Sequence, residues 1–286
     1  MRYGNCISHK DPGKIKILKQ LGFDYVETGL SGLYASSEQE IADFIGALGE
    51  NKLTCEAVNV FFPGDVALCG EDADFARAQD YVSEVWEKVK NVGIKAAVFG
   101  SGRARYCPEG FPKERAVEQI IRVAGEILAP AAEKYGFVIA IEELNKGETN
   151  TINSLAEAEY IAEQVNHRRI RVLADIYHIA KEGDTLASLK APALLAHCHV
   201  SSPVTRLYPH KTDAPEDVAV VKQFFADLAA IGYGQRQGLD GGRMSIEAGL
   251  GGLAPTDEAV PGFVSEADRA FYLECKHALA FMGELC

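Results

Sequence analysis

The sequence lacks the features that mark a membrane protein or a nucleic-acid-binding protein. Its 286 residues contain no apolar run long enough to span a bilayer, and the first residues, MRYGNC, hold no basic segment followed by an apolar stretch. Lys and Arg number 29 against 41 Asp and Glu, which gives a net charge of −12. A phosphate backbone is bound by clustered Lys and Arg, so this balance argues against a nucleic-acid partner. We therefore expect a soluble, cytoplasmic protein with neither a membrane nor a nucleic-acid partner.

Cysteine pairs are also missing. The seven cysteines include no CxxC motif, and their odd number favours reduced thiols over a disulfide framework. Cys6, Cys55 and Cys198 lie inside apolar strand patterns, where cysteine acts as a small core hydrophobe. We assign no chemistry to any of the seven, Cys286 included.

What the sequence does contain is eight short apolar runs separated by amphipathic segments. The runs predict strands at Arg2–Ile7, Tyr25–Thr28, Thr54–Val60, Ala96–Phe99, Val138–Glu142, Arg171–Asp175, Leu195–Val200 and Met244–Glu247. Between two of them, SLAEAEYIAEQV opens at Ser154 with Glu157 three residues later, a pattern typical of a capping box. The length and the 47% apolar content suit one barrel. The predicted fold is α/β, a single (β/α)8 TIM barrel over residues 1–286.

Four of the predicted strands end in a side chain that can bind a metal ion. FVIAIE ends at Glu142, IRVLAD at Asp175, LLAHCH at His199 and RMSIE at Glu247. The carboxyl ends of barrel strands meet at one face, so these side chains are expected to converge. One such acid alone is often a helix cap or an ion-pair partner, but four together favour a site. Three carboxylates and one imidazole suit Mn, Mg or Co better than a structural zinc.

The motifs around these residues have a recognisable order. IEELNKGETN places Glu142 and Glu148 six residues apart, DIYH holds Asp175 and His178, and HCH and SIE follow. LGFDYVETG and VFGSGRAR extend the pattern over essentially the whole chain. In this order the motifs resemble the xylose isomerase-like family of sugar isomerases and epimerases, and within it the ketose 3-epimerase branch.

The resemblance implies one divalent metal ion, Mn²⁺ before Mg²⁺, Co²⁺ or Zn²⁺, bound by Glu142, Asp175, His199 and Glu247. It also implies that Glu148 and His178 contact a small-molecule sugar or sugar derivative, and that the protein is a homo-oligomer, a dimer or a tetramer. In such a site the cation stabilises an enediolate, while Glu142 and Glu247 remove and return a proton from opposite sides. We expect a metal-dependent ketose 3-epimerase that works through a cis-enediolate.

Other polar residues at the strand ends have less specific interpretations. Glu27 ends YVETG and is expected either to support the site or to contact substrate. His197 lies two residues before His199, on the same strand face, and is expected one layer below the metal as support. Glu143 is expected to point outward as an ion-pair partner, and Asn145 to order its loop through backbone hydrogen bonds.

Long connections follow the third, fourth and seventh strands, where barrel enzymes carry active-site loops, at residues 61–72, 100–112 and 201–216. Their aromatic residues are expected to form walls of the pocket: Phe61, Phe62, Tyr106 and Phe111. In GSGRAR, Arg103 and Arg105 are expected to be solvated beside a glycine turn, with a phosphate clamp as the alternative. Phe75 and Trp86 lie on an amphipathic helix and are expected in the core or at a subunit interface.

The sequence departs from the ketose 3-epimerase pattern after His199. The segment SSPVTRLYPHKTDAP holds no Pro-Gly turn, and Arg206 lies at a displaced position as the candidate for a substrate-binding arginine. The substrate therefore stays open among a ketohexose, a modified sugar, a sugar acid, an inositol derivative and a sugar phosphate.

Three alternative functions share the barrel. A 1,2-aldose-ketose isomerase, or a hydroxypyruvate-type isomerase, would bind its substrate in a different register along the same metal. Apurinic endonucleases use similar strand-end ligands but add histidines for three zinc ions, whereas the runs VNVF and AVFG end here without a histidine. A non-catalytic sugar-binding barrel would have no use for two proton-transferring carboxylates.

Overall fold

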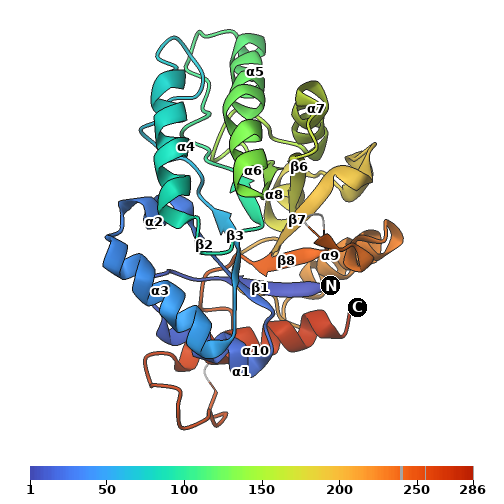
Figure 1. Cartoon of the computed structure of the whole chain (residues 1–286). Helices are drawn as coiled ribbons and strands as arrows, with labels where there is room; N and C mark the ends of the chain where they lie inside the picture. The colour runs from blue at the N-terminus through green and yellow to red at the C-terminus, as the bar shows by residue number, and fades with distance from the viewer. Residues whose placement is uncertain (239–240, 255, 286) are drawn as a thin grey trace.

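The computed structural model describes residues 1–238, 241–254 and 256–285, and its centre is a closed barrel of eight parallel strands (Figure 1). Each strand pairs with the next along the chain, and the last pairs with the first. The strands are β1 Arg2–Cys6, β2 Tyr25–Gly29, β3 Cys55–Asn59, β4 Ala96–Phe99, β5 Val138–Glu142, β6 Ile170–Asp175, β7 Leu195–Val200 and β8 Arg243–Ile246. The predicted (β/α)8 barrel is confirmed, with every strand end within one residue of that predicted. Glu247 follows β8 directly instead of ending it.

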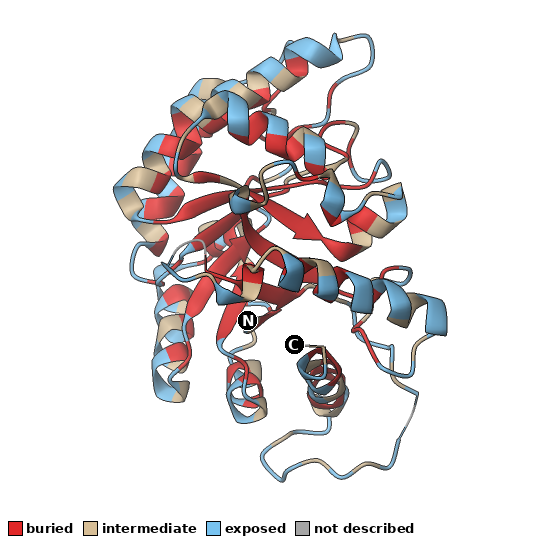
Figure 2. Ribbon diagram, turned by 90° about the vertical axis from the view of Figure 1, so that its right-hand side faces the viewer, coloured by how far each residue is buried: buried red, intermediate tan, exposed pale blue. Residues whose placement is uncertain are grey.

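Helices surround the barrel and turn their apolar faces to it, so that the strands are buried and the outer helix faces are exposed (Figure 2). The outer layer comprises α1 Gly13–Leu21, α2 Leu30–Ala35, α3 Glu38–Asn51, α4 Phe75–Val89, α5 Lys113–Arg122, α6 Ala129–Tyr135, α7 Leu155–Val165, α8 Ile176–Glu182, α9 Pro215–Ala230 and α10 Arg269–Gly283. A π-helical segment, η1 Val123–Leu128, joins α5 to α6, where Pro130 cannot donate a backbone hydrogen bond.

The capping box predicted at the start of α7 is half formed. The Ser154 hydroxyl accepts the Glu157 N–H at 3.2 Å, as expected for an N-cap. The Glu157 carboxylate, however, accepts the N–H of Asn153 instead of that of Ser154. A complete capping box occurs at α3, between Ser37 and Glu40.

Side chains fill the barrel interior below the strand ends. One layer contains Tyr25, Ala57, Ala96, Val138 and Ala196, and the next contains Val98, Ala140 and Leu173. Gly4 is required beside the Tyr25 ring, because a Cβ at this position would lie 2.2 Å from a ring carbon. The interior is thus closed by packing, and polar side chains gather at the carboxyl ends of the strands.

Phe61 and Phe62 are buried in the hydrophobic core, so the prediction that they form walls of the pocket is wrong. After β3, Val60 adopts a left-handed conformation with φ of 46°, and both phenyl rings turn into the layer between the sheet and α4. There they pack on Phe99, at ring centroid distances of 6.4 and 5.9 Å. The backbone turn at Val60 decides the direction of both rings, and the sequence gives no sign of it.

The predicted helix that carries Phe75 and Trp86 is present as α4. Trp86 lies in the core, the first of its two expected positions, and stacks on Phe137 at 3.8 Å between ring centroids. Phe75 is half-buried against the same core.

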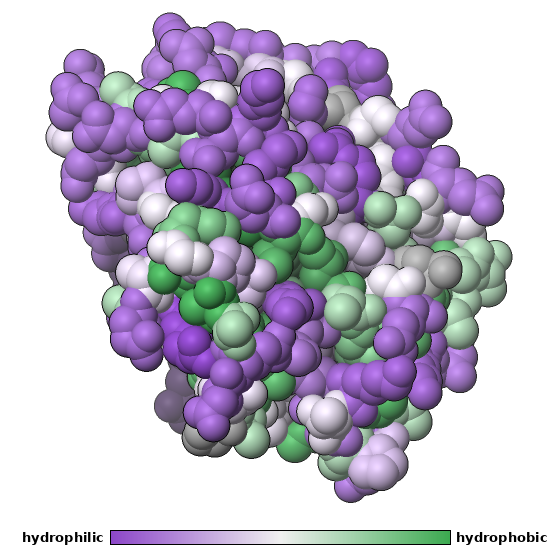
Figure 3. All heavy atoms as spheres, turned by 90° about the horizontal axis from the view of Figure 1, so that it is seen from below, coloured by the Kyte–Doolittle hydropathy of each residue, from purple (hydrophilic) through white to green (hydrophobic). Residues whose placement is uncertain are grey.

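The outer surface is mixed. Seen from below, hydrophilic side chains cover most of the face, and hydrophobic ones gather in a smaller central area (Figure 3). None of the helices in the described ranges is long and apolar enough to cross a membrane.

The six described cysteines are free thiols, and Cys286 lies outside the described residues. Cys55 and Cys198 are buried in the core as predicted, whereas Cys6 is only half-buried, so its assignment as a core residue is wrong.

At the amino-terminal end of the barrel, Glu56 of β3 holds two other strands. Both oxygens of its carboxylate accept hydrogen bonds from Arg2 at 2.7 Å, and one also accepts from the buried Arg243 at 2.8 Å. Burial alone would raise the pKa of Glu56, but these hydrogen bonds outweigh it and lower the pKa. This stabilisation is present above the ordinary carboxyl pKa and is lost as the pH falls through the lowered value.

Glu56→Gln should therefore lower the free energy of unfolding at neutral pH by about 3 kcal/mol, because it removes the carboxylate that neutralises a buried guanidinium. Urea denaturation at several pH values would measure the change, which should shrink in acid. Glu133→Gln is the matched control, since Glu133 also meets two arginines, Arg168 and Arg169, but at the exposed surface. An equal loss in both variants would contradict this role of Glu56.

Candidate metal centre

The four predicted ligands converge at the carboxyl end of the barrel. Glu142 and Asp175 end β5 and β6, His199 lies in β7, and Glu247 follows β8. Each offers one ligand atom, and these atoms lie within 4.8 Å of one another. His199 Nδ1 is at the centre, 3.3 Å from Glu142 Oε1, 3.5 Å from Glu247 Oε2 and 3.8 Å from Asp175 Oδ2. The sequence placed these residues at strand ends, and the structure brings all four together.

Burial makes the negative charge of this cluster costly. Burial and the neighbouring Glu247 raise the pKa of Asp175 to about 7, and burial also raises the pKa of Glu142. Burial would raise the pKa of Glu247 too, but the positive charges of His199 and Arg206 outweigh it and lower this pKa to about 2. Burial would lower the pKa of His199, but Glu27 and Glu247 raise it well above its ordinary value. The cluster therefore needs positive charge to hold all its carboxylates ionised.

A divalent cation meets that need. The donor set consists of carboxylate oxygens and one imidazole nitrogen, which suits Mn²⁺, Mg²⁺ or Co²⁺ in an oxygen-rich site. The residues present thus fit a hard or borderline metal ion.

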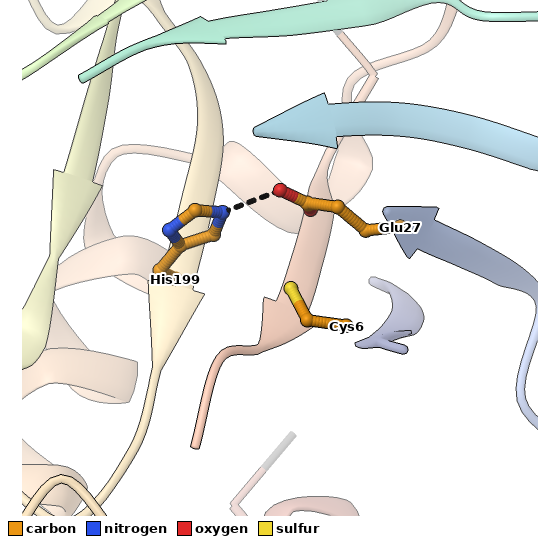
Figure 4. A group of neighbouring side chains, drawn as sticks. All are labelled: Cys6, Glu27 and His199. Carbon is orange, nitrogen blue, oxygen red and sulfur yellow. Dashed lines mark hydrogen bonds and ion pairs between the residues drawn. The ribbon is translucent and has the colours of Figure 1, made fainter. Parts of the chain in front are cut away.

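A second layer of buried residues orients His199. Glu27 is fully buried and pairs with His199 Nε2 at 2.9 Å (Figure 4). It also pairs with His197 Nε2 at 2.8 Å. When Nε2 of His199 carries the proton and donates to Glu27, Nδ1 presents its lone pair to the three carboxylates. Of the two interpretations of Glu27, the structure favours support of the site. His197 lies below His199, as predicted, and acts through Glu27.

Glu247 is held from two sides. Asn59, at the end of β3, donates from Nδ2 to Glu247 Oε1 at 2.8 Å. Arg206 donates from Nη2 to Glu247 Oε2 and from Nη1 to Glu148 Oε1, both at 2.8 Å. The displaced arginine therefore reaches the site, helped by a left-handed backbone with φ of 57°. Sequence reasoning missed Asn59, although a polar residue at the end of a strand was a signal.

His178 lies on α8, next to the four candidate ligands. Its Nδ1 accepts the backbone N–H of Asn145 at 3.2 Å and lies 2.8 Å from Asn145 Nδ2. Its Nε2 is buried 3.7 Å from Asp175 Oδ2, without a hydrogen-bond partner among the described residues. Burial and the charge of Arg206 lower the pKa of His178 to about 3, so the ring is neutral. Asn145 Oδ1 accepts the backbone N–H of Gly147 at 2.9 Å, so Asn145 orders its loop through a backbone hydrogen bond as predicted. Its Nδ2 also donates to Glu148 Oε1 at 3.0 Å.

Comparison with known proteins places this barrel in a family. The family model described as xylose isomerase-like TIM barrel matches residues 15–250. The chain belongs to the xylose isomerase-like TIM barrel family. The predicted family is thus confirmed.

Several relatives within the family are named epimerases. The chain is 26% identical to the D-psicose 3-epimerase of Ruminiclostridium cellulolyticum over 196 residues, which cover 65% of this chain and 64% of that protein. It is 24% identical to the 3-dehydro-D-guloside 4-epimerase of Escherichia coli K12 over 203 residues, covering 66% and 72%. The solved D-psicose 3-epimerase of Clostridium cellulolyticum with D-tagatose superposes with a TM-score of 0.77 at 19% identity, covering 100% of this chain and 99% of that one. The sequence match to the D-psicose 3-epimerase of Ruminiclostridium cellulolyticum spans less than two thirds of that protein's length.

Two residues behind the ligands of this xylose isomerase-like barrel differ from their predicted roles. Glu143 is buried and accepts the backbone N–H of Asp175 at 2.8 Å, so it is no outward ion-pair partner, and burial raises its pKa well above the ordinary value. Arg105 is fully buried and donates to the carbonyl oxygens of Phe99 at 3.1 Å and of Glu142 at 2.7 Å. It is neither solvated nor a phosphate clamp; it joins the ends of β4 and β5.

The remaining loop residues lie to one side of the four ligands. Arg103 is exposed as expected. Tyr106 and Phe111 line an open cavity of about 610 Å³ between the loops after β4 and β5, together with Lys113 and Lys146. None of the four candidate ligands lines this cavity, so a role of Tyr106 and Phe111 as walls of the substrate pocket stays a prediction.

Gly100 lies against the carboxylate of Glu142, one of the four candidate ligands. A Cβ at Gly100 would lie 2.1 Å from Glu142 Oε2, so Gly100→Ala should displace this carboxylate. We expect a loss of metal affinity of about tenfold or more with the fold retained, measured by metal titration and circular dichroism. Gly46→Ala is the control, because a Cβ there meets nothing within 4 Å. Unchanged metal affinity in Gly100→Ala would show that Glu142 is not held at this position.

Proposed function

We propose that this chain is a metal-dependent sugar epimerase of the ketose 3-epimerase type, which moves a proton on a carbon next to a carbonyl group through a cis-enediolate. The proposal rests on the positions of two carboxylates. Glu142 ends β5, Glu247 directly follows β8, and both belong to the same four-residue cluster. When bound, the divalent cation would polarise the carbonyl and hydroxyl oxygens of the sugar and stabilise the developing negative charge.

The two carboxylates have environments suited to opposite proton transfers. Burial raises the pKa of Glu142 while His199 and Arg206 lower that of Glu247, so of the two carboxylates Glu142 takes up a proton more readily. One carboxyl thus donates a proton while the other accepts one, as inversion at a carbon requires. Asn59 and Arg206 fix the direction of the Glu247 carboxylate.

Three residues would bind the sugar. The unpartnered Nε2 of His178 is a donor for a sugar oxygen, since Nδ1 is engaged by Asn145. Glu148 and Arg206 stand at the mouth of the site as a partly exposed pair, able to exchange their mutual contact for sugar hydroxyl groups. The names of the relatives support a ketose or a keto sugar as substrate. We propose 3-epimerisation ahead of 1,2-isomerisation, in keeping with the D-psicose 3-epimerase among them.

The cation is proposed to be Mn²⁺ first, because the donors are mostly oxygen with a single nitrogen. We also propose a homo-oligomer, a dimer or a tetramer, from the family resemblance alone.

A screen for proton exchange tests the function. The Mn²⁺-loaded protein is incubated in heavy water with D-psicose, D-fructose, D-tagatose and an oxidised glucoside, and each sugar is examined by nuclear magnetic resonance. Deuterium at a carbon beside the carbonyl, together with the matching epimer, is the expected result. A protein that binds its metal ion and sugar but exchanges no proton would be a binding barrel, and three zinc ions per chain would favour a nuclease.

Glu148→Ala should raise KM by about tenfold while the metal content stays near that of the parent protein, because Glu148 is not among the four ligands. Steady-state kinetics and metal analysis give the two numbers. Glu182→Ala is the matched control, since Glu182 pairs with Lys146 on the outer side of the same loop. Loss of metal in Glu148→Ala would mean that its role is misassigned.

A further inference from the structure

His199 has a second group of ligand atoms on the side away from the three carboxylates. Cys6 ends β1, Glu27 lies in β2, and their Sγ and carboxylate oxygen lie with a His199 nitrogen within 4.8 Å of one another. The three side chains point toward a common space (Figure 4). Glu27 and His199 are fully buried, whereas Cys6 is half-buried, so an ion can reach the group from the Cys6 side.

The chemistry of this second group differs from that of the first. It combines one sulfur, one nitrogen and one oxygen, a donor set that favours thiophilic ions such as Zn²⁺ and Cd²⁺ over Mn²⁺ or Mg²⁺. Three protein ligands also leave one position open, as in zinc sites that bind water or substrate. His197 pairs with Glu27 Oε2 at 2.8 Å and leaves Oε1, which faces His199, for an ion.

We propose that Cys6, Glu27 and His199 bind a thiophilic divalent cation, and that its binding excludes the cation of the carboxylate cluster. The exclusion rests on the metal site of the proposed function; the Cys6 site itself does not. A neutral imidazole has one lone pair, and His199 faces the carboxylates with Nδ1 and Glu27 with Nε2. An ion on Nε2 therefore forces the ring proton onto Nδ1, where it points at Glu142 Oε1 3.3 Å away.

The protons balance in this exchange. Starting from a cation on Nδ1, the ring proton moves from Nε2 to Nδ1, the hard cation leaves, and the Cys6 thiol releases one proton to solvent as its sulfur binds the thiophilic ion. The ring itself neither gains nor loses a proton. The enzyme would thus be inhibited by zinc or cadmium through an exchange at one histidine, without the inhibiting ion binding any of the three carboxylates.

Cadmium is the probe for the site. Metal-free protein is titrated with Cd²⁺, and the ultraviolet sulfur-to-cadmium absorption is followed along with the bound metal per chain. We expect Cys6→Ser to lose that absorption and to bind Cd²⁺ at least about tenfold more weakly. Glu27→Gln, which keeps the thiol, should weaken binding as well. Cys107→Ser is the matched control, because Cys107 lies near Cys69 and this pair of thiols is another place where cadmium could bind. If the ion binds at Cys6, this variant should behave as the parent protein.

Displacement tests the exclusion. Protein loaded with Mn²⁺ is titrated with Cd²⁺, and released Mn²⁺ is measured by electron paramagnetic resonance; one Mn²⁺ should appear for each Cd²⁺ bound, but not in Cys6→Ser. An absorption that survives in Cys6→Ser overturns the site, and Cd²⁺ binding with Mn²⁺ retained overturns the exclusion. A chain that never binds Mn²⁺ but shows Cys6-dependent Cd²⁺ binding would refute the proposed function and the exclusion while upholding the Cys6 site.

Discussion

Glu247→Gln is expected to lower kcat/KM by about a thousandfold or more and to weaken the bound cation. The substitution keeps the size of the side chain but removes its negative charge, so the cluster loses a ligand and the sugar loses a proton-transfer group. It also removes the carboxylate that Asn59 and Arg206 hold in place. The amide could still accept one hydrogen bond, which is why little change in the fold is expected.

Turnover on the true substrate and metal content by plasma mass spectrometry measure the two effects. Glu258→Gln is the matched control, because Glu258 lies in the same connection between β8 and α10 but pairs with Lys276 and His277 far along the chain. Full turnover in Glu247→Gln would eliminate its proposed role in proton transfer.

Removal of the metal ion should abolish activity altogether. In the metal-free site the carboxylates of Glu142, Asp175 and Glu247 face one another, and His199, Arg206 and Arg105 offset only part of their negative charge. No remaining group would then stabilise an enediolate, and a loss of about 10³-fold or more follows from the several kcal/mol that a bound cation supplies. Mn²⁺ should restore activity best among Mn²⁺, Mg²⁺, Co²⁺ and Zn²⁺.

Dialysis against a chelator, followed by activity and metal analysis, gives the result. Circular dichroism of the metal-free protein should match that of the loaded protein, since the barrel is held by its core and by ladders such as β1 with β8. Full activity in protein shown to carry no metal would disprove metal dependence.

The barrel and the gathering of its four candidate ligands could be predicted because both depend on local patterns. Strand periodicity sets which residue ends each strand, and parallel strands in a barrel bring those ends to one face. Glu142, Asp175, His199 and Glu247 follow from these two rules alone. Their roles in catalysis are predictions that the experiments above test.

Residues beyond the strand ends could not be predicted in the same way, because their direction depends on the backbone of single loop residues. Val60 and Arg206 both have positive φ, which buries Phe61 and Phe62 in one case and brings an arginine to Glu247 in the other. Arg105 looks like a surface residue in GSGRAR, yet it satisfies two strand-end carbonyl groups. A sequence pattern records residue type and spacing, whereas these contacts depend on torsion angles.

Because side chains fill the barrel interior, the candidate site is reached from the carboxyl ends of the strands. Tyr25 packed over Gly4, and the aliphatic layer above it, close the far end, so sugar can arrive and depart only past the loops at the carboxyl ends of the strands. An epimer formed by the proposed reaction would differ from its precursor at one carbon and carry the same hydroxyl groups. Departing and arriving molecules would then compete for one passage, and the reaction would slow as its own product accumulates.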